Sequence, residues 1–352
     1  MDVARVNVLV LMGGKSGEHS VSLRSGRGVY LALDRARYNP IPVIIGEDGL
    51  WLLPPADDCP LEPDQSWRRC NLAEGLAFLQ AKAGLVFPVM HGANGEDGTM
   101  QGMLQLAGLP FVGSDCGASA LAMNKPRTKD VYRCAGLATP PGVWFTSADW
   151  RCDSFRILQD ITALGIPCVV KTCRSGSSVG VSIVREASAL LTIIEELLPL
   201  SGDLLVEGFV KGREFTCGVI EDPRDGLAPR ALPIVEIRPR VSSWFDFKAK
   251  YQADGSDELC PAPIPPALAQ RFQEAGLAAH KFLGCRGMSR TDIIWNEAED
   301  RVEVIETNTI PGFTEASLLP KAAAAAGLDY AALVNLLVAA ALKYGSGSAA
   351  EA

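Results

Sequence analysis

The chain is organised around the stretch GMSRTDIIWNEAEDRVEVIETNTIPGFT, residues 287–314. Two runs rich in β-branched residues, 291–295 and 301–307, flank the polar segment 296–300. Strand-forming runs on both sides of a short polar segment predict a β-hairpin with a loop of about four or five residues.

Acidic side chains face each other across this predicted hairpin. Because side chains alternate along a strand, a loop of about five residues places Asp292 opposite Glu306. The same register places Arg290 opposite Asn308. Directly opposed carboxylates repel each other, and a Mg²⁺ ion held by Asp292, Glu306 and Asn308 together with phosphate oxygens would relieve that repulsion. Spacing alone leaves open a solvated hairpin whose charges face water.

Composition limits the class of protein. The chain has 352 residues, of which 48% are hydrophobic and 21% are charged, and this length predicts about two or three domains. A net charge of -8 argues against nucleic acid or an anionic membrane as partner. The 10 cysteines form no CxxC pair, so we expect reduced thiols in a cytoplasmic protein. The apolar run 331–342 is too short to span a bilayer.

The first part of the chain predicts an α/β domain. An apolar strand over residues 6–12 leads into a glycine loop and a helix over about residues 22–36. Ligands bind at the carboxyl ends of strands in such sheets, so Glu18 is a candidate for holding an amino group; the alternative is a first-turn residue favoured by the helix dipole. His91 opens the glycine-rich turn 91–99 and is either a ligand contact or a buried, hydrogen-bonded histidine.

A lysine-bearing strand followed by a Gly/Ser-rich turn predicts a phosphate-binding flap. Lys171 precedes the turn 174–180, whose N–H groups and hydroxyls are suited to polyphosphate. Gly/Ser turns are common, and Lys171 strengthens the interpretation. The strand 204–210 that follows either lines an adenine pocket or is a plain edge strand. The aromatic segment 242–257 is typical of a functional loop, and residues 321–343 predict one amphipathic helix or a pair.

Motifs spread along the chain resemble those of the D-alanine–D-alanine ligases, a family of the ATP-grasp superfamily. In chain order they are HGANGEDGTMQG (91–102), GSSVG (176–180), KAKY (248–251), SRTD (289–292) and ETNTIPGFT (306–314). The resemblance runs from Val6 to about Tyr344 and preserves the order of the family's motifs. It implies an α/β chain, α+β in its C-terminal part, in the three-domain ATP-grasp architecture.

The resemblance also implies domain boundaries. Residues 1–115 would form an N-terminal α/β domain on the side of the first substrate. Residues 116–207 would form a central domain with the phosphate flap. Residues 208–345 would carry the metal hairpin, the substrate loop and the C-terminal helices, and ATP would lie between the central and C-terminal domains.

The activity implied is ATP-dependent ligation of two D-alanine molecules for peptidoglycan precursor synthesis. ATP phosphorylates the carboxylate of the first D-alanine, and the amine of the second attacks the acyl phosphate. Such phosphoryl transfer depends on positioning and charge neutralisation. The family uses ATP with Mg²⁺, usually two ions, for which Mn²⁺ can substitute. Its members are usually cytoplasmic homodimers that act on small molecules, without nucleic acid or membrane partners.

Site residues carry over position by position. Positions matching ATP contacts are Lys125, Lys171, Ser178, Glu207, Phe209, Val210, Glu214 (on the ribose) and Lys250. The positions matching metal ligands are Asp292, Glu306 and Asn308, with the glutamate bridging. Positions matching catalytic groups are Glu18, Ser177, Tyr251, Arg290 and Gly312. Positions matching other substrate contacts are His91, Ser317 and Leu318.

Their implied roles follow the reaction. Arg290 and the backbone N–H of Gly312 would stabilise the oxyanion of the tetrahedral intermediate. Glu18 would hold the first substrate's ammonium, with Ser177 and Tyr251 as hydrogen-bonding partners that latch the substrate loop and exclude water. Ser317 and Leu318 would receive the second substrate's carboxylate.

Specificity depends on few positions. Relatives that make the D-alanyl-D-lactate ester lack the loop tyrosine, and several resistance-type relatives carry Arg where this chain has Leu318. Tyr251 and Leu318 therefore favour an amine as second substrate. Ser20 and Ala316 depart from the family's usual Glu and His, which keeps open a D-Ser or D-hydroxy acid acceptor.

Two further departures concern the nucleotide. Thr172 replaces a common Pro, which should leave the flap's backbone route less fixed, and Gly208 replaces a common lysine of the adenine pocket, which should lower ATP affinity. A catalytically inactive ATP-binding regulator, or a metal-free binding protein, is the non-enzymatic alternative. Intact acids on both hairpin strands argue against it.

Overall fold

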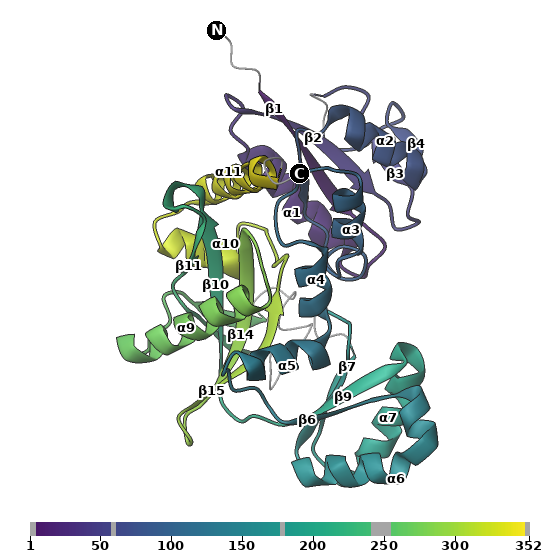
Figure 1. Ribbon diagram of the computed structural model, residues 1–352, viewed down its shortest axis with the longest axis vertical. Coiled ribbons are helices and arrows are strands. Elements are labelled where there is room, and N and C mark those ends of the chain that lie inside the picture. Colours follow the sequence, from purple (N-terminus) through teal and green to yellow (C-terminus); the bar gives the residue numbers. More distant parts are fainter. Residues whose placement is uncertain (1–4, 58–60, 177–179, 241–254, 349–352) are drawn as a thin grey trace.

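The computed structural model describes residues 5–57, 61–176, 180–240 and 255–348. Within them the strands form three sheets that follow one another along the chain, and along the long axis of the molecule the last of the three lies between the other two (Figure 1). Each range expected for a domain holds one sheet, with β9 ending at Gly208. The domain boundaries themselves stay a prediction.

The first sheet has five strands in the order β4-β3-β2-β1-β5. Its strands are β1 (Val6–Gly13), β2 (Tyr38–Ile45), β3 (Trp51–Leu53), β4 (Arg68–Cys70) and β5 (Leu85–Pro88), accompanied by helices α1 (His19–Ala32), α2 (Leu72–Lys82) and α3 (Thr99–Leu106). β1 pairs in parallel with β2 and β5, and its central residues are fully buried, which explains its continuous apolar run. The expected strand is confirmed.

Helix α1 begins and ends earlier than the range 22–36 expected for it. It ends at Ala32 because Leu33 has extended backbone angles (φ -65°, ψ 131°). The side chain of Asp34 then accepts the N–H of Ala36 at 2.9 Å, which forms a turn in place of another helical turn.

The middle sheet is antiparallel and has the order β6-β9-β7-β8. Its elements are β6 (Gly142–Thr146), α6 (Ser147–Leu164), β7 (Cys168–Thr172), β8 (Val181–Val184), α7 (Ala187–Ser201) and β9 (Asp203–Gly208). Cys168 and Val170 pack into the core formed with α6 and α7. Because side chains alternate, Val169 and Lys171 are left on the opposite face of β7. The two strands expected on either side of the flap turn, β7 and β8, are present, and residues 177–179 of the turn lie outside the described residues.

The third sheet has the order β13-β12-β10-β14-β15, with β11 also paired to β10. Its strands are β10 (Arg213–Asp222), β11 (Ala228–Ala231), β12 (Val235–Pro239), β13 (Ser256–Leu259), β14 (Met288–Asn296) and β15 (Arg301–Asn308), and the 3₁₀ turn η1 (Pro223–Asp225) follows β10. Phe215, Cys217 and Val219 of β10 pack in one core with helix α9 (Pro266–Phe282), whereas Ile220 packs in the core that holds α10 and α11. Helices thus cover both faces of this sheet.

The C-terminal region forms two helices, α10 (Leu318–Ala325) and α11 (Tyr330–Ser348), so of the single helix and the pair that the sequence left open, the pair is present. In Figure 1, α11 lies beside α1, and one hydrophobic core contains residues of both together with β1 and β10. Asn335 interrupts the apolar run because its side chain bonds Asp34 N and Ala32 O, each at 3.0 Å. No single helix in the described ranges is long and apolar enough to cross a membrane, and α10 and α11 meet that test only together, across a bend of 102°.

Candidate active site

The β14–β15 hairpin has the predicted register. Asp292 pairs with Glu306, and Arg290 pairs with Asn308. The turn is tighter than the five-residue loop behind the prediction, because Asn296 pairs with Arg301. A bulge next to Asp292 then adds a residue to β15 and restores the predicted pairing.

The bulge also decides which side chains enter the site. Ile293 pairs with Val304 and Asp292 with Glu306, so Ile305 is the extra residue. Both Ile305 and Glu306 line the same cavity, although they are neighbours in a strand. The bulge therefore presents an apolar side chain and an acidic one to one ligand space.

Arg290 balances the charge of Asp292 from the same strand. Its Nε donates to Oδ1 of Asp292 at 3.0 Å, and a terminal guanidinium nitrogen donates to Oδ2 at 2.9 Å. Thr216 Oγ1 donates to Oδ1 at 2.7 Å, and Asn308 Nδ2 lies 3.5 Å from Oδ2. These contacts orient the Asp292 carboxylate beneath the cavity.

The hairpin's donor set fits a hard divalent cation. Asp292 and Glu306 offer carboxylate oxygens and Asn308 an amide oxygen, which are the ligand types that Mg²⁺ prefers. No group of three or more His, Cys, Asp and Glu side chains suited to a metal occurs in the described part of the chain. The third protein donor here is an amide, so phosphate oxygens and water would have to complete the coordination.

A cavity of about 290 Å³ lies between the middle and third sheets. Its apolar walls include Val169 and Ile183 on one side and Ile294 and Ile305 on the other. Predicted nucleotide and metal residues that line it are Lys125, Lys171, Glu207, Phe209, Val210, Glu214, Asp292 and Glu306. An apolar slot with charged groups at its edge suits a purine base and its phosphates.

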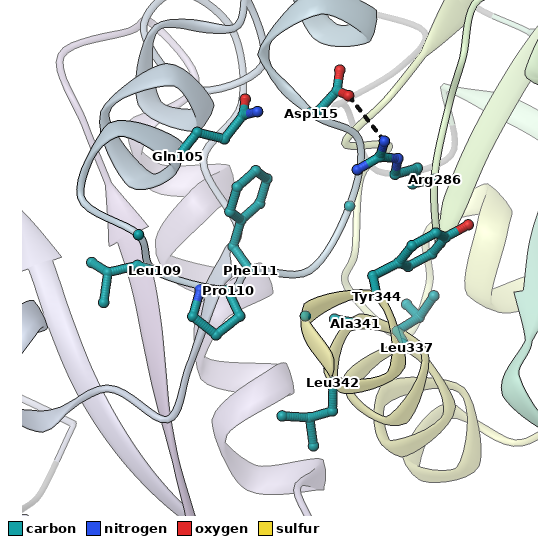
Figure 2. Close-up of a pocket in the computed structure, with 14 residues that line it drawn as sticks. Gln105, Leu109, Pro110, Phe111, Asp115, Arg286, Leu337, Ala341, Leu342 and Tyr344 are labelled. Carbon is teal, nitrogen blue, oxygen red and sulfur yellow. Dashed lines mark ion pairs between the residues drawn. The ribbon is translucent and has the colours of Figure 1, made fainter. Parts of the chain in front are cut away.

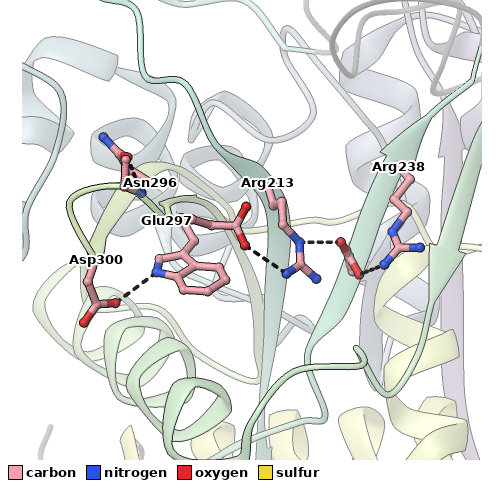
Figure 3. A network of polar contacts seen from close by, with 8 residues as sticks. Arg213, Arg238, Asn296, Glu297 and Asp300 are labelled. Atoms are coloured by element: carbon pink, nitrogen blue, oxygen red, sulfur yellow. Dashed lines mark hydrogen bonds and ion pairs between the residues drawn. The ribbon is translucent and has the colours of Figure 1, made fainter.

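An ion-pair network links β10 to β12 beside this cavity (Figure 3). The buried carboxylate of Glu236 accepts from Arg213 Nε and from Arg238, both at 2.8 Å. The Arg213 guanidinium also lies over the rings of Phe215 and Trp295, at 5.1 and 5.6 Å from their centroids. The network holds β10 where it carries the neighbouring Glu214.

Lys125 joins the helical segment to the flap. Helices α4 (Cys116–Met123) and α5 (Lys125–Cys134) meet at Asn124, whose side chain caps α5. This places Lys125 at the first position of α5, where its Nζ donates to the Ser175 carbonyl at 2.5 Å. Burial lowers the pKa of Lys125, and the nearby Glu306 carboxylate opposes that effect.

A second cavity, of about 390 Å³, holds the predicted amino-acid contacts. Those that line it are Glu18, His91, Arg290, Asn308, Gly312, Ser317 and Leu318. Ser317 is the N-cap residue of helix α10, and its Oγ accepts the Thr314 N–H at 3.0 Å. A side chain at Gly312 would come within 3.2 Å of that oxygen, so glycine keeps the approach open.

The surroundings of Glu18 and His91 distinguish between the two roles that the sequence left open for each residue. Glu18 is the N-cap residue of α1, but its side chain makes no capping hydrogen bond and lines the second cavity instead. His91 donates from Nδ1 to the Ile310 carbonyl at 3.2 Å and accepts at Nε2 from Ser25 at 3.3 Å. Burial lowers the pKa of His91, so it is a neutral, hydrogen-bonded histidine at the cavity wall.

The two cavities meet at a narrow space of about 20 Å³. Lys125 and Glu306 line both this space and the first cavity, and Asn308 lines both this space and the second. Ser177, Ser178, Lys250 and Tyr251 lie outside the described residues. The other predicted site residues surround the two cavities.

The backbone at Thr172 is held by hydrogen bonds, although the absence of a proline at this position predicted a less fixed route for the flap. Its N–H donates to the Gly180 carbonyl at 3.0 Å, and its hydroxyl bonds the Ser175 hydroxyl. A proline at this position would lack the N–H. The two bonds close the base of the flap, so the threonine fixes the route by other means.

Glu96 is a site residue that motif reasoning passed over. It lies in the turn HGANGEDGT, is buried, and lines the second cavity and the narrow space. Burial, with Glu18 adding to it, raises the pKa of Glu96 to about 8. A side chain at Gly176 would lie 3.1 Å from Glu96 Oε1 and 3.5 Å from Glu18 Oε2, so both acids converge under the flap.

This raised pKa predicts a pH-dependent stability. An unfolded Glu titrates near 4.5, so the stabilising effect of the proton on Glu96 is complete below that pH and is lost as pH rises through about 8. As the pH rises from 5 to 9, we expect the free energy of unfolding of Glu96→Gln to increase relative to that of the wild type by more than about 1.4 kcal/mol. This value corresponds to a tenfold change in the equilibrium constant. Urea unfolding at several pH values measures this, with the exposed Glu274→Gln as control. A pH-independent difference would contradict it.

A larger cavity, of about 540 Å³, lies away from these residues (Figure 2). Phe111, Leu337 and Tyr344 are among its lining residues, and an ion pair of 3.4 Å between Asp115 and Arg286 crosses one side. No predicted site residue lines it. The charged groups suited to nucleotide chemistry gather instead at the two smaller cavities.

Known proteins match the chain over nearly all of its length. Residues 7–114 match the family described as D-ala D-ala ligase N-terminus, and residues 131–339 match D-ala D-ala ligase C-terminus. The D-alanine–D-alanine ligase of Desulfotalea psychrophila is 40% identical over 336 residues, 95% of this chain and 94% of that protein.

Solved structures agree with the sequence matches. The VanG D-Ala:D-Ser ligase from Enterococcus faecalis has a TM-score of 0.84 at 30% identity, covering 96% of this chain and 100% of that one. The D-alanine–D-alanine ligase from Bacillus anthracis, solved complexed with ATP, has a TM-score of 0.76 at 28% identity, covering 97% and 99%. With both family segments matched in order, the chain belongs to the D-alanine–D-alanine ligase family, within the ATP-grasp fold.

Proposed function

We propose that the protein joins two D-alanine molecules into D-alanyl-D-alanine at the expense of ATP, for peptidoglycan precursor synthesis. The observation that carries this proposal is the meeting of two cavities at Glu306 and Asn308. One has the form of a nucleotide slot, and the other holds an acid for an ammonium and an arginine for a developing oxyanion. The relatives' shared activity supports it.

In the first step, a carboxylate oxygen of one D-alanine attacks the γ-phosphorus of ATP, and ADP leaves. Lys125 and Lys171 hold the phosphates, and Glu18 holds the substrate's ammonium. Asp292, Glu306 and Asn308 would hold Mg²⁺, which would neutralise phosphate charge. Ser178 and Lys250 complete the phosphate contacts, and Glu207, Phe209, Val210 and Glu214 hold the adenosine.

In the second step, the amine of the second D-alanine attacks the acyl carbon, phosphate leaves, and the nitrogen loses its proton. Arg290 and the Gly312 N–H stabilise the oxyanion formed on the carbonyl oxygen. Ser317 and Leu318 receive the second carboxylate, with His91 at the cavity wall. Ser177 and Tyr251 latch the substrate loop. We also propose a cytoplasmic homodimer without nucleic acid or membrane partners.

Phosphate release from ATP and Mg²⁺ tests the function. Single D- and L-amino acids are assayed first, then pairs, with products identified by mass. Release that requires D-alanine and yields the mass of D-Ala-D-Ala supports the proposal. If ATP binds but none of the amino acids, alone or in pairs, triggers phosphate release, the result would instead support a regulator.

D-Serine is a second candidate acceptor. The likeness to the VanG D-Ala:D-Ser ligase, together with Ser20 and Ala316, favours it, whereas Leu318 and the D-alanine–D-alanine ligase relatives favour D-alanine. Equimolar D-alanine and D-serine in one reaction distinguish the two by the mass of the predominant dipeptide.

Tyr251→Phe is expected to weaken the choice between amine and hydroxyl acceptors. Loss of the latching hydroxyl lets water and hydroxy acids compete for the acyl phosphate, so hydrolysis and D-lactate ester should rise relative to dipeptide. The measurement is the ratio of kcat/KM for D-alanine and D-lactate, with ADP formed per dipeptide as a second readout. If both the kcat/KM ratio and the ADP formed per dipeptide are unchanged, Tyr251 does not act as a latch.

A further inference from the structure

One buried carboxylate is shared by two lysines. Glu207 of β9 is 2% exposed, and its Oε1 accepts from Lys129 whereas its Oε2 accepts from Lys171. Lys129, in α5, is equally buried and also donates to Thr139 Oγ1 at 2.9 Å. Lys171 lines the nucleotide cavity, but Lys129 does not.

The charges of this trio depend on one another. Burial raises the pKa of Glu207, but Lys171 and Lys129 more than offset it, so the pKa is lowered overall. Burial lowers the pKa of Lys129, and Glu207 opposes that effect. Removing one partner of a buried pair leaves an uncompensated charge and is strongly destabilising. Glu207 therefore needs at least one lysine in every state of the site.

When a nucleotide binds, the two lysines would contact different partners. Lys171 is the one able to reach the phosphates, because it lines the cavity and lies at the base of the flap. Lys129 is held behind the cavity by Thr139 and by its place in α5. When Lys171 turns to the phosphates, Lys129 is the cation that stays with Glu207.

We propose that Lys129 is a positioning residue for the nucleotide: it keeps Glu207 an ionised acceptor for the amino group of adenine. The inference rests on the proposed ATP-dependent function. A carboxylate in an apolar slot accepts from an amino group, but faces repulsion from a base with a carbonyl oxygen at that position. Adenine would thus be selected over hypoxanthine.

Binding of ADP and IDP to the full chain with Mg²⁺, without amino acids, tests this inference. We expect the wild type to prefer ADP, and Lys129→Met to reduce the ADP/IDP affinity ratio at least tenfold, mostly through weaker ADP binding. Tyr344→Phe is the matched control, since it removes a 2.7 Å bond to the buried Glu221 far from this cavity. It should lower stability and leave the ratio unchanged.

The double variant Lys129→Met/Glu207→Gln separates charge from packing. It removes the charges of Lys129 and Glu207 together, while Lys171 keeps its own charge at the cavity wall. An amide can present either its oxygen or its NH₂ group, so the double variant should bind ADP and IDP about equally. Equal weakening of both nucleotides by Lys129→Met, or an ADP preference in the double variant like that of the wild type, would overturn the inference. A wild type that binds neither nucleotide would instead overturn the proposed function.

Discussion

Replacing Glu306 by Gln is expected to lower turnover by at least about 10³-fold, since several kcal/mol of charge stabilisation in the transition state depend on the metal. Glu306 is the acid that lines both the nucleotide cavity and the narrow space leading to the substrates. Gln has the same shape without the charge. Losing that charge removes a repulsion with the opposite Asp292 and an attraction to the buried Lys125, so the two effects oppose each other and the free energy of unfolding should change little.

Phosphate release measures the turnover of Glu306→Gln, and urea unfolding measures its stability. A Mg²⁺ titration of the thermal shift caused by ADP should show a higher metal requirement. Glu299→Gln is the control, because Glu299 is an exposed acid in the turn of the same hairpin. Turnover within tenfold of the wild type would contradict the metal role of Glu306.

The hairpin shows what periodicity can and cannot predict. Alternation along two strands predicted that Asp292 faces Glu306, and the structure confirms it. The prediction assumed a loop of about five residues, whereas the structure combines a tighter turn with a bulge at Ile305. Both produce the same pairing beyond the bulge. The sequence carried no local signal for the bulge, since a β-branched residue fits either a regular strand or a bulged one.

Contacts between distant segments were beyond the reach of sequence patterns. Glu96 gains its raised pKa from burial and from Glu18, which lies in another loop. Only its placement in the GED triplet of a glycine-rich turn could have drawn attention to it. The sequence patterns assigned no role to Lys129, because its partner Glu207 is far away in the chain. The family resemblance identified the site residues, but only the three-dimensional structure identifies these partners.

Replacing Arg290 by Met is expected to lower kcat about 10²–10³-fold, the usual effect of removing a donor to an oxyanion. Arg290 lines the amino-acid cavity together with Gly312. It does not line the nucleotide cavity, so binding of ADP with Mg²⁺ should survive, in contrast to Glu306→Gln. The loss of the bidentate bond to Asp292 should also destabilise the fold by about 1.5–3 kcal/mol.

Arg238→Met separates that loss of stability from catalysis. Arg238 pairs with Glu236 at the same spacing, two residues apart in one strand, and at 2.8 Å. It lines neither the nucleotide nor the amino-acid cavity, so its loss should affect unfolding and leave kcat near the wild-type value. Arg290→Lys keeps the positive charge but lacks the planar guanidinium group, so it should restore only part of kcat. If Arg290→Met loses no more kcat than Arg238→Met, Arg290 does not act on the oxyanion, because its effect would then be that of a strand ion pair alone.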